Sequence, residues 1–206
     1  MEIRDIRAVL FDMDGTLVDS DAVVDRSWSR WAVECGLDPV AVLAVAHGNP
    51  AAATIAQFLP DASAAELATA GARVLDLEVS DVEGVVAKPG AVQLIGTLDR
   101  IGLPWAVYTS APAQLAKLRL TVSGIAPSVL VTVDDVSRGK PDPEGYLRAA
   151  ELLGVPVTEC LVVEDTVVGL TAGQASGAMT AGLKGVPADL ELPDLHRLDA
   201  LFQGLE

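Results

Sequence analysis

Phe11-Asp12-Met13-Asp14-Gly15-Thr16-Leu17-Val18 is the stretch that decides the fold of this chain. It continues the apolar run 8–11, which predicts a short buried strand, and Gly15 ends that strand. Both aspartates therefore lie at the carboxyl end of a strand, where open α/β sheets bind their ligands. A sharp turn at Gly15 can let Asp14 swing back over the site that Asp12 faces. Paired carboxylates in this place suit a hard divalent cation and phosphoryl chemistry.

The Asp-x-Asp-Gly fragment has two other interpretations, a polar turn and a calcium loop. The fragment alone does not separate a polar turn from a ligand site. A calcium loop needs a third oxygen ligand and a glutamate six residues after the glycine. In this chain Thr16 follows the glycine, the position six residues after the glycine is Asp21 and not a glutamate, and the residues between include Leu17 and Val18. The calcium interpretation therefore fails.

Composition limits the classes of protein to which the chain can belong. Its 206 residues allow one domain, or a core with one insertion, and a hydrophobic content of 50% is enough for a substantial core. The formal net charge of −15 argues against a nucleic-acid partner, because such partners are bound by clustered Lys and Arg. Neither a basic amphipathic stretch nor an apolar run of about 18 residues indicates a membrane partner.

The two cysteines and the first residues indicate the compartment. Cys35 and Cys160 lie in apolar contexts far apart in the sequence, so we expect reduced, buried thiols and no disulfide. Residues 1–5 are charged and have no hydrophobic signal core. These features predict a soluble, cytoplasmic protein.

Hydrophobic periodicity divides the chain into a helical part and an alternating part. The helical part predicts helices at 20–35, which Asp19 or Ser20 is placed to cap, and at 39–46, 50–58 and 63–76. After Pro89, the pattern predicts strands at 104–108, 129–133, 160–163 and 178–183, with helices at 90–101, 112–123, 143–154 and 166–176. Residues 188–206 predict a packing helix. Alternation of this kind implies parallel strands joined by right-handed crossovers.

The fold class that follows is α/β, with a Rossmann-like parallel-sheet core and an inserted α-helical cap domain. The core takes residues 1–17 and 88–206, and the cap takes residues 18–87.

Three more polar clusters follow predicted strands, namely Thr109-Ser110, Lys140 in the proline-containing loop Gly139-Lys140-Pro141-Asp142-Pro143, and Glu164-Asp165. Each has an ordinary alternative when taken singly: the Thr-Ser pair is typical of a helix cap, and a loop lysine is usually solvated. Hydroxyls and backbone N–H groups at a helix start also bind phosphate, and two acids near a buried edge are costly without a cation. Because all of them lie at strand ends, we expect them to form one site.

This combination resembles the haloacid dehalogenase superfamily of phosphotransferases, and within it the small sugar- and polyol-phosphate phosphatases with a helical cap. The resemblance covers nearly the whole chain up to about residue 183. The stretches that carry it are FDMDGTLVDS, SWSRWAVECGL, HGNPAAATIAQFL, EGVVAKPGA, VYTSAPAQLAKLRL, GKPDPEGYLRAAELLGV and CLVVEDTVVGLTAGQASG.

The resemblance implies a phosphoaspartyl mechanism. Asp12 would attack phosphorus and form an aspartyl phosphate. Asp14 would protonate the leaving alkoxide and then activate the hydrolytic water. True dehalogenases of the superfamily lack an acid at that position.

The resemblance also implies the ligands of Mg²⁺ and of the phosphate. Mg²⁺ would be held by the Asp12 carboxylate, the Asp14 backbone carbonyl and Asp165, with Glu164 close by. The transferring oxygens would be fixed and neutralised by Thr109, Ser110 and Lys140. An oxygen-only ligand set favours Mg²⁺, although it does not exclude Mn²⁺.

Cap residues are expected to face the substrate, namely Asp19-Ser20 at the hinge, His47-Gly48-Asn49 in a mid-cap loop, and Glu83-Gly84 near the return linker. In the sugar-phosphate phosphatases this loop commonly reads His-Gly-Arg, so Asn49 stands where an arginine is common. Residues 31–72 contain no Lys or Arg, so a second phosphate would find little to bind. We therefore expect a small sugar or polyol monophosphate, such as a hexose phosphate or glycerol phosphate, as the partner.

Two other functions remain open on the sequence alone. One is a hexose-phosphate mutase of the same superfamily, similar to β-phosphoglucomutase. Such a mutase must hold a bisphosphate, and the lack of Lys and Arg in residues 31–72 disfavours it. The other is a non-catalytic metabolite-binding protein, which is disfavoured because both Asp12 and Asp14 are present. The oligomeric state has no sequence signal.

Overall fold

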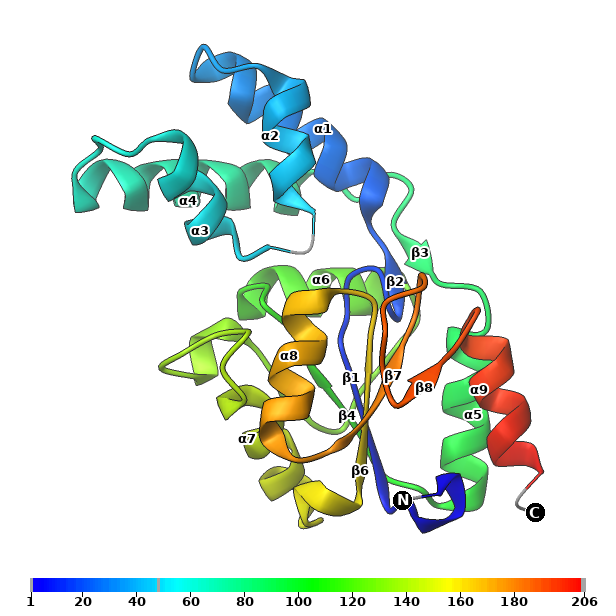
Figure 1. Cartoon of the computed structure of the whole chain (residues 1–206). Coiled ribbons are helices and arrows are strands. Elements are labelled where there is room, and N and C mark those ends of the chain that lie inside the picture. Colours follow the sequence, from blue (N-terminus) through cyan, green and yellow to red (C-terminus); the bar gives the residue numbers. More distant parts are fainter. Residues whose placement is uncertain (1, 48, 205–206) are drawn as a thin grey trace.

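The computed structural model describes residues 2–47 and 49–204. Within these residues, a parallel six-stranded sheet has the order β5-β4-β1-β6-β7-β8 (Figure 1). Its strands are β1 (Ala8–Phe11), β4 (Trp105–Tyr108), β5 (Leu130–Val131), β6 (Cys160–Glu164), β7 (Met179–Gly182) and β8 (Leu190–Glu191). The predicted α/β core with a parallel sheet is confirmed.

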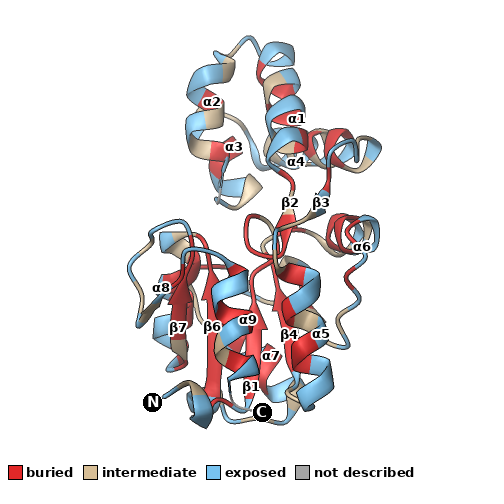
Figure 2. Ribbon diagram, turned by 90° about the vertical axis from the view of Figure 1, so that its right-hand side faces the viewer, coloured by how far each residue is buried: buried red, intermediate tan, exposed pale blue. Residues whose placement is uncertain are grey.

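Helices cover both faces of this sheet, and the central strands β1, β4 and β6 are buried (Figure 2). Val9 and Phe11 of β1 pack into one hydrophobic cluster with α5, α6 and α9, while Ala8 and Leu10 pack into another with α7 and α8. The helices are α5 (Ala91–Ile101), α6 (Ala113–Val122), α7 (Glu144–Leu153), α8 (Val167–Ser176) and α9 (Leu195–Gln203). Burial on both faces explains why the strands read as continuous apolar runs.

The position of β1 between β4 and β6 brings distant motifs together. Phe11, the last residue of β1, is in register with Val107 of β4 and Val163 of β6. Because parallel strands end at the same edge, the residues that follow these positions meet there.

The helical layer above that edge is formed by α1 (Asp21–Glu34), α2 (Pro39–Ala46), α3 (Ala51–Phe58) and α4 (Ala64–Ser80). It has its own buried cluster, in which the rings of Trp28 and Trp31 lie edge to face at 5.5 Å. A capping box between Ser63 and Glu66 starts α4. The predicted end of α4 at residue 76 was too early, because Leu77 continues its buried face.

A pair of short strands connects the two layers. β2 (Val18–Asp19) and β3 (Val86–Ala87) are antiparallel, and Lys88 Nζ lies 3.1 Å from an Asp19 carboxylate oxygen. Strands of two residues are too short to produce a periodic signal, and for that reason the sequence did not predict them. The two segments that connect the core with the helical layer therefore lie side by side.

Three further expectations need correction. β5 covers only Leu130–Val131 of the predicted 129–133, because a 3₁₀ turn closed by the Asp135 carboxylate follows it. The predicted packing helix at 188–206 is shorter, since β8 precedes α9. Cys35 is exposed at the end of α1, whereas Cys160 is buried, and both are free thiols.

No helix in residues 2–47 or 49–204 combines the length and the apolar character that a membrane crossing requires.

Candidate active site

A tight turn after β1 brings Asp12 and Asp14 to one cavity. The Met13 carbonyl accepts hydrogen bonds from the backbone N–H groups of Thr16, Leu17 and Val18, and Gly15 adopts a φ of +88°. Asp12 and Asp14 both line a cavity of about 350 Å³, to which residues of the helical layer α1–α4 also contribute. The turn thus allows Asp14 to face the same space as Asp12, as the glycine predicted.

Lys140 lines this cavity and is buried between two carboxylates. Its Nζ lies 2.5 Å from Asp12 Oδ1 and 2.6 Å from Glu164 Oε1, and 4.9 Å from the centre of the Tyr108 ring. Burial alone would lower the pKa of Lys140, but Asp12 and Glu164 together raise it above its ordinary value. Lys140 is therefore a fixed cation beside Asp12, and the alternative of a solvated loop lysine is wrong.

Glu164 holds Lys140 and has little capacity for another ligand. Its oxygens accept hydrogen bonds from Lys140, from the Tyr146 hydroxyl at 2.8 Å, from the Thr166 hydroxyl at 3.0 Å and from the Asp165 backbone N–H. The side chain is fully buried, and a Cβ at Gly169 would overlap it. Glu164 therefore orients Lys140.

Asp165 reaches the cavity beside Asp12. One of its oxygens accepts a hydrogen bond from the Thr16 hydroxyl at 3.2 Å, and the other lies 2.8 Å from Lys184 Nζ. Burial raises the pKa of Asp165, although the nearby Lys184 opposes this rise. Burial likewise raises the pKa of Asp12 well above its usual range, against the influence of Lys140.

These acids have the properties of a divalent-cation site. Asp12, Glu164 and Asp165 each offer an oxygen, and the three oxygens lie within 4.8 Å of one another. Burial raises the pKa values of Asp12 and Asp165, so a cation at this place would stabilise their charged forms. Because the hydrogen bonds of Glu164 are satisfied, Asp12 and Asp165 are the better direct ligands. Oxygen donors and excess negative charge fit a hard divalent metal.

Thr109 and Ser110 also line the cavity. Neither occupies the N-cap position of α6, which belongs to Pro112, so the helix-cap alternative is wrong. The Thr109 hydroxyl instead accepts a hydrogen bond from the Ala111 backbone N–H at 3.0 Å. Both hydroxyls lie at the edge where β4 ends.

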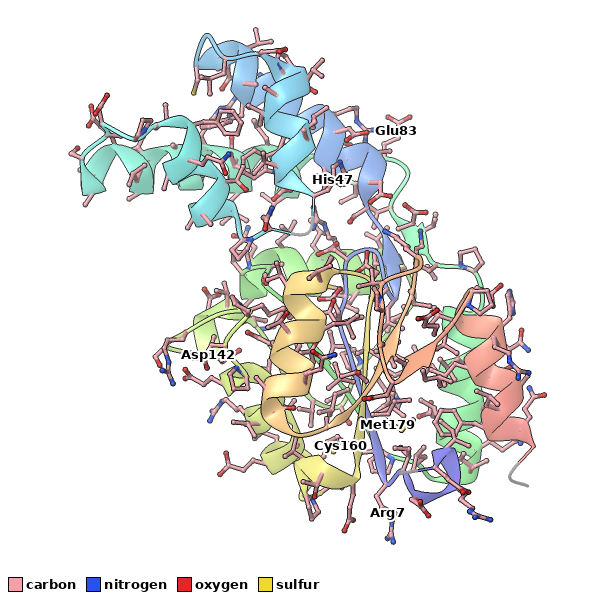
Figure 3. All side chains as sticks on the ribbon, in the orientation of Figure 1. Arg7, His47, Glu83, Asp142, Cys160 and Met179 are labelled. Carbon is pink, nitrogen blue, oxygen red and sulfur yellow. The ribbon has the colours of Figure 1, made fainter. Side chains whose placement is uncertain are left out.

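The predicted cap residues separate into two groups. Ser20, His47 and Asn49 line the cavity, whereas Asp19 and Glu83 are not among its lining residues. Figure 3 shows His47 at the end of α2 that faces the core, and Glu83 away from it near the return to β3. Asp19 pairs with Lys88, and the exposed Glu83 accepts a hydrogen bond at its backbone carbonyl from Arg26. Gly48 lies outside the described residues.

Hydrogen bonds explain how two of these cap residues are held. His47 Nε2 lies 2.7 Å from an Asp25 oxygen, and the Asn49 amide donates to the Val45 carbonyl at 2.7 Å. Ser20, expected to cap α1, stands at the N-cap position but donates its hydroxyl to Asp14 at 2.7 Å. Ser20 is therefore part of the cavity.

Four charged residues that were not predicted from the sequence also line the cavity, namely Asp21 of α1, Glu78 of α4, Arg119 of α6 and Lys184 after β7. Arg119 Nη1 lies 2.9 Å from Asp14 Oδ1, and its Nη2 lies 3.2 Å from Glu78 Oε1. The sequence did contain a signal for two of these residues, because Glu78 and Arg119 are charged residues on otherwise apolar helix faces. For Lys184 the sequence offers no such pattern.

Comparisons with known proteins agree with this geometry. Residues 6–177 match the family model of the haloacid dehalogenase-like hydrolases. Hexitol phosphatase A of Escherichia coli K12 is 41% identical over 97% of this chain and 92% of its own length. The 2-deoxyglucose-6-phosphate phosphatase 1 of Saccharomyces cerevisiae is 33% identical over 84% of this chain and 78% of its own. A β-phosphoglucomutase structure from Clostridium difficile has a TM-score of 0.79 at 18% identity, covering 97% of this chain and 98% of its own.

The chain belongs to the haloacid dehalogenase-like hydrolase family. At 18% identity, the mutase structure shows a shared fold only. Within the family this chain is a phosphatase, an enzyme that hydrolyses phosphoric monoesters.

Gly15→Ala is expected to damage the site more than an equally strained substitution elsewhere. A Cβ at Gly15 would overlap the Asp165 carboxylate and approach Lys184. Gly36 has a similarly positive φ of +68°, but a Cβ there meets nothing within 4 Å. Gly36→Ala should cost about 1–2 kcal/mol of unfolding free energy from backbone strain alone. Gly15→Ala should cost more and should also reduce phosphatase activity, as thermal melts and phosphate release will measure; equal effects of the two substitutions would contradict this geometry.

Proposed function

We propose that this phosphatase hydrolyses small sugar or polyol monophosphates through an aspartyl phosphate on Asp12, with Mg²⁺ as cofactor. The observation that carries the proposal is the meeting of Asp12, Asp14 and Lys140 at one cavity. Lys140 engages Asp12 Oδ1, and within the described residues no hydrogen bond reaches Asp12 Oδ2. That second oxygen is the one available for attack on phosphorus.

The reaction takes two displacements at phosphorus. First, an Asp12 oxygen attacks, the bond from phosphorus to the substrate oxygen breaks, and Asp14 gives that oxygen a proton. Next, water loses a proton to Asp14 and attacks the same phosphorus, so that the bond to Asp12 breaks and inorganic phosphate leaves. Lys140, Thr109 and Ser110 are placed to stabilise the transferring oxygens.

Mg²⁺ would be held by the carboxylates of Asp12 and Asp165 and by the main-chain carbonyl of Asp14. When bound, it would supply positive charge that offsets the repulsion between the phosphate and these carboxylates. Glu164 would remain behind these ligands, where it orients Lys140.

The substrate class follows from the cavity and from the relatives. A volume of about 350 Å³ suits a small molecule. The cap side presents Asp21 together with His47 and Asn49, which suits hydroxyl groups and disfavours a second anionic group. Relatives named as hexitol and 2-deoxyglucose-6-phosphate phosphatases support a polyhydroxylated monophosphate that carries no second charged group.

Phosphate release from a substrate panel tests this function. Hexitol, hexose and glycerol phosphates should be hydrolysed with Mg²⁺, and chelation of the metal should abolish release until Mg²⁺ is restored. Phosphoglycolate, which adds a carboxylate, should have a kcat/KM at least about 10-fold lower because like charges oppose its binding. Isomerisation of a hexose phosphate without phosphate release would overturn the proposal in favour of a mutase.

A further inference from the structure

Two charged side chains lie on helix faces that are otherwise apolar, one in the helical layer and one in the core. Glu78 shares the buried face of α4 with Val74 and Leu77. Arg119 shares the buried face of α6 with Leu115. Burying a charge is costly unless it is paired, so the two positions require an explanation beyond packing.

Arg119 connects Glu78 to Asp14. The guanidinium is 5% exposed, and its two Nη atoms reach the two carboxylates at 2.9 and 3.2 Å. α4 and α6 lie against each other where the helical layer meets the core (Figure 1). Burial alone would lower the pKa of Arg119, but Asp14 and Glu78 together raise it, so the guanidinium stays cationic.

This arrangement makes the two oxygens of Asp14 different. Oδ1 accepts hydrogen bonds from the Ser20 hydroxyl at 2.7 Å and has Arg119 Nη1 at 2.9 Å. Across the described part of the chain, no hydrogen bond reaches Oδ2. An oxygen that already faces two donors is a poor place for a proton, so the proton of a protonated Asp14 belongs on Oδ2.

We infer that Arg119 is a positioning residue for Asp14: it holds Oδ1 so that Oδ2 delivers the proton to the leaving oxygen, and Glu78 holds Arg119 in place. The inference rests on the proposed role of Asp14 as the acid. In this step the bond from phosphorus to the leaving oxygen breaks, that oxygen takes the Oδ2 proton, and Asp14 becomes a carboxylate beside the Arg119 cation. The guanidinium therefore also stabilises the charge that Asp14 acquires.

Substrates with different leaving groups test this role. The alcohol of a hexitol phosphate needs a proton as it leaves, whereas p-nitrophenolate does not. Arg119→Met should therefore lower kcat/KM for a hexitol phosphate by about 100-fold, the usual size of a general-acid contribution, and for p-nitrophenyl phosphate by less than about threefold. kcat/KM is the correct quantity because it reports the steps up to departure of the alcohol.

Further variants complete the experiment. Glu78→Gln should show a smaller loss with the same dependence on the leaving group, and Arg119→Lys should recover part of the activity. Adding Glu78→Gln to Arg119→Met should cost nothing further, because the two residues act through one contact. Lys117→Met removes an exposed cation from the same helix and should change neither substrate.

Two outcomes would overturn the inference. One is an equal loss on both substrates, which is what a general structural defect produces; the other is no loss on the hexitol phosphate. If Arg119→Met does not fold, the same comparison with Arg119→Lys and Glu78→Gln decides. The proposed function fails separately, namely if the wild-type protein with Mg²⁺ releases phosphate from neither substrate.

Discussion

Asp12→Asn should abolish phosphate release while the protein remains folded. The substitution keeps the size of the side chain and removes the nucleophilic oxygen, so no aspartyl phosphate can form. Loss of a nucleophile lowers kcat by about 10⁴-fold or more. Lys140 keeps its contact with Glu164 at 2.6 Å, which preserves the local packing. Continuous phosphate detection on a hexitol phosphate with Mg²⁺ measures the loss.

The stability of this variant provides the control. Burial raises the pKa of Asp12, so its charged form is unfavourable in the folded protein without metal. Asp12→Asn should therefore melt at the same temperature as the wild type or higher when metal is chelated. Asp61→Asn alters an exposed carboxylate and should leave both activity and melting unchanged. Substantial turnover in Asp12→Asn would rule out a covalent role for Asp12.

Lys140→Met should impair both stability and activity. It leaves the buried Asp12 and Glu164 carboxylates facing each other without their shared cation. Breaking a buried ion pair from one side costs about 3–5 kcal/mol of unfolding free energy. The loss of a fixed positive charge beside the phosphoryl group should lower kcat by about 10²–10³-fold. Denaturant unfolding and phosphate release measure the two effects.

Two variants separate these effects. Lys88→Met removes the more exposed ion pair with Asp19 and should cost less than about 1 kcal/mol. Combining Lys140→Met with Glu164→Gln removes one of the two unpaired charges, so stability should partly return while activity should not. Recovery of activity in the double variant would show that Lys140 only neutralises Glu164.

The strand-end motifs could be predicted because a buried parallel strand has a clear sequence pattern. Residues 8–11 and 160–164 are continuous apolar runs with acids at or after their ends. Once the strands are placed as neighbours, Asp12 and Asp165 must approach each other. Lys140 could be predicted as a site residue because Pro141 and Pro143 stiffen the loop that carries it.

Other parts of the site could not be predicted, for physical reasons. Arg119 and Glu78 lie 41 residues apart in the sequence and on different helices. A helical pattern indicates the face on which a residue lies but not its partner. The direction of His47 and Asn49 depends on loop hydrogen bonds to Asp25 and to the Val45 carbonyl. Cys35 looked buried from its apolar neighbours, but it lies where α1 ends. The division into core and cap domains stays a prediction.

The central claim, an aspartyl phosphate on Asp12, is tested most directly by trapping it. In Asp14→Asn the second displacement lacks its base, while p-nitrophenyl phosphate needs no acid for the first. Rapid mixing with Mg²⁺, acid quench and peptide mass spectrometry should find one phosphoryl group per protein, on Asp12, with one equivalent of p-nitrophenolate. Release of p-nitrophenolate with no phosphoryl group on the protein, or with the group on another residue, would contradict the mechanism.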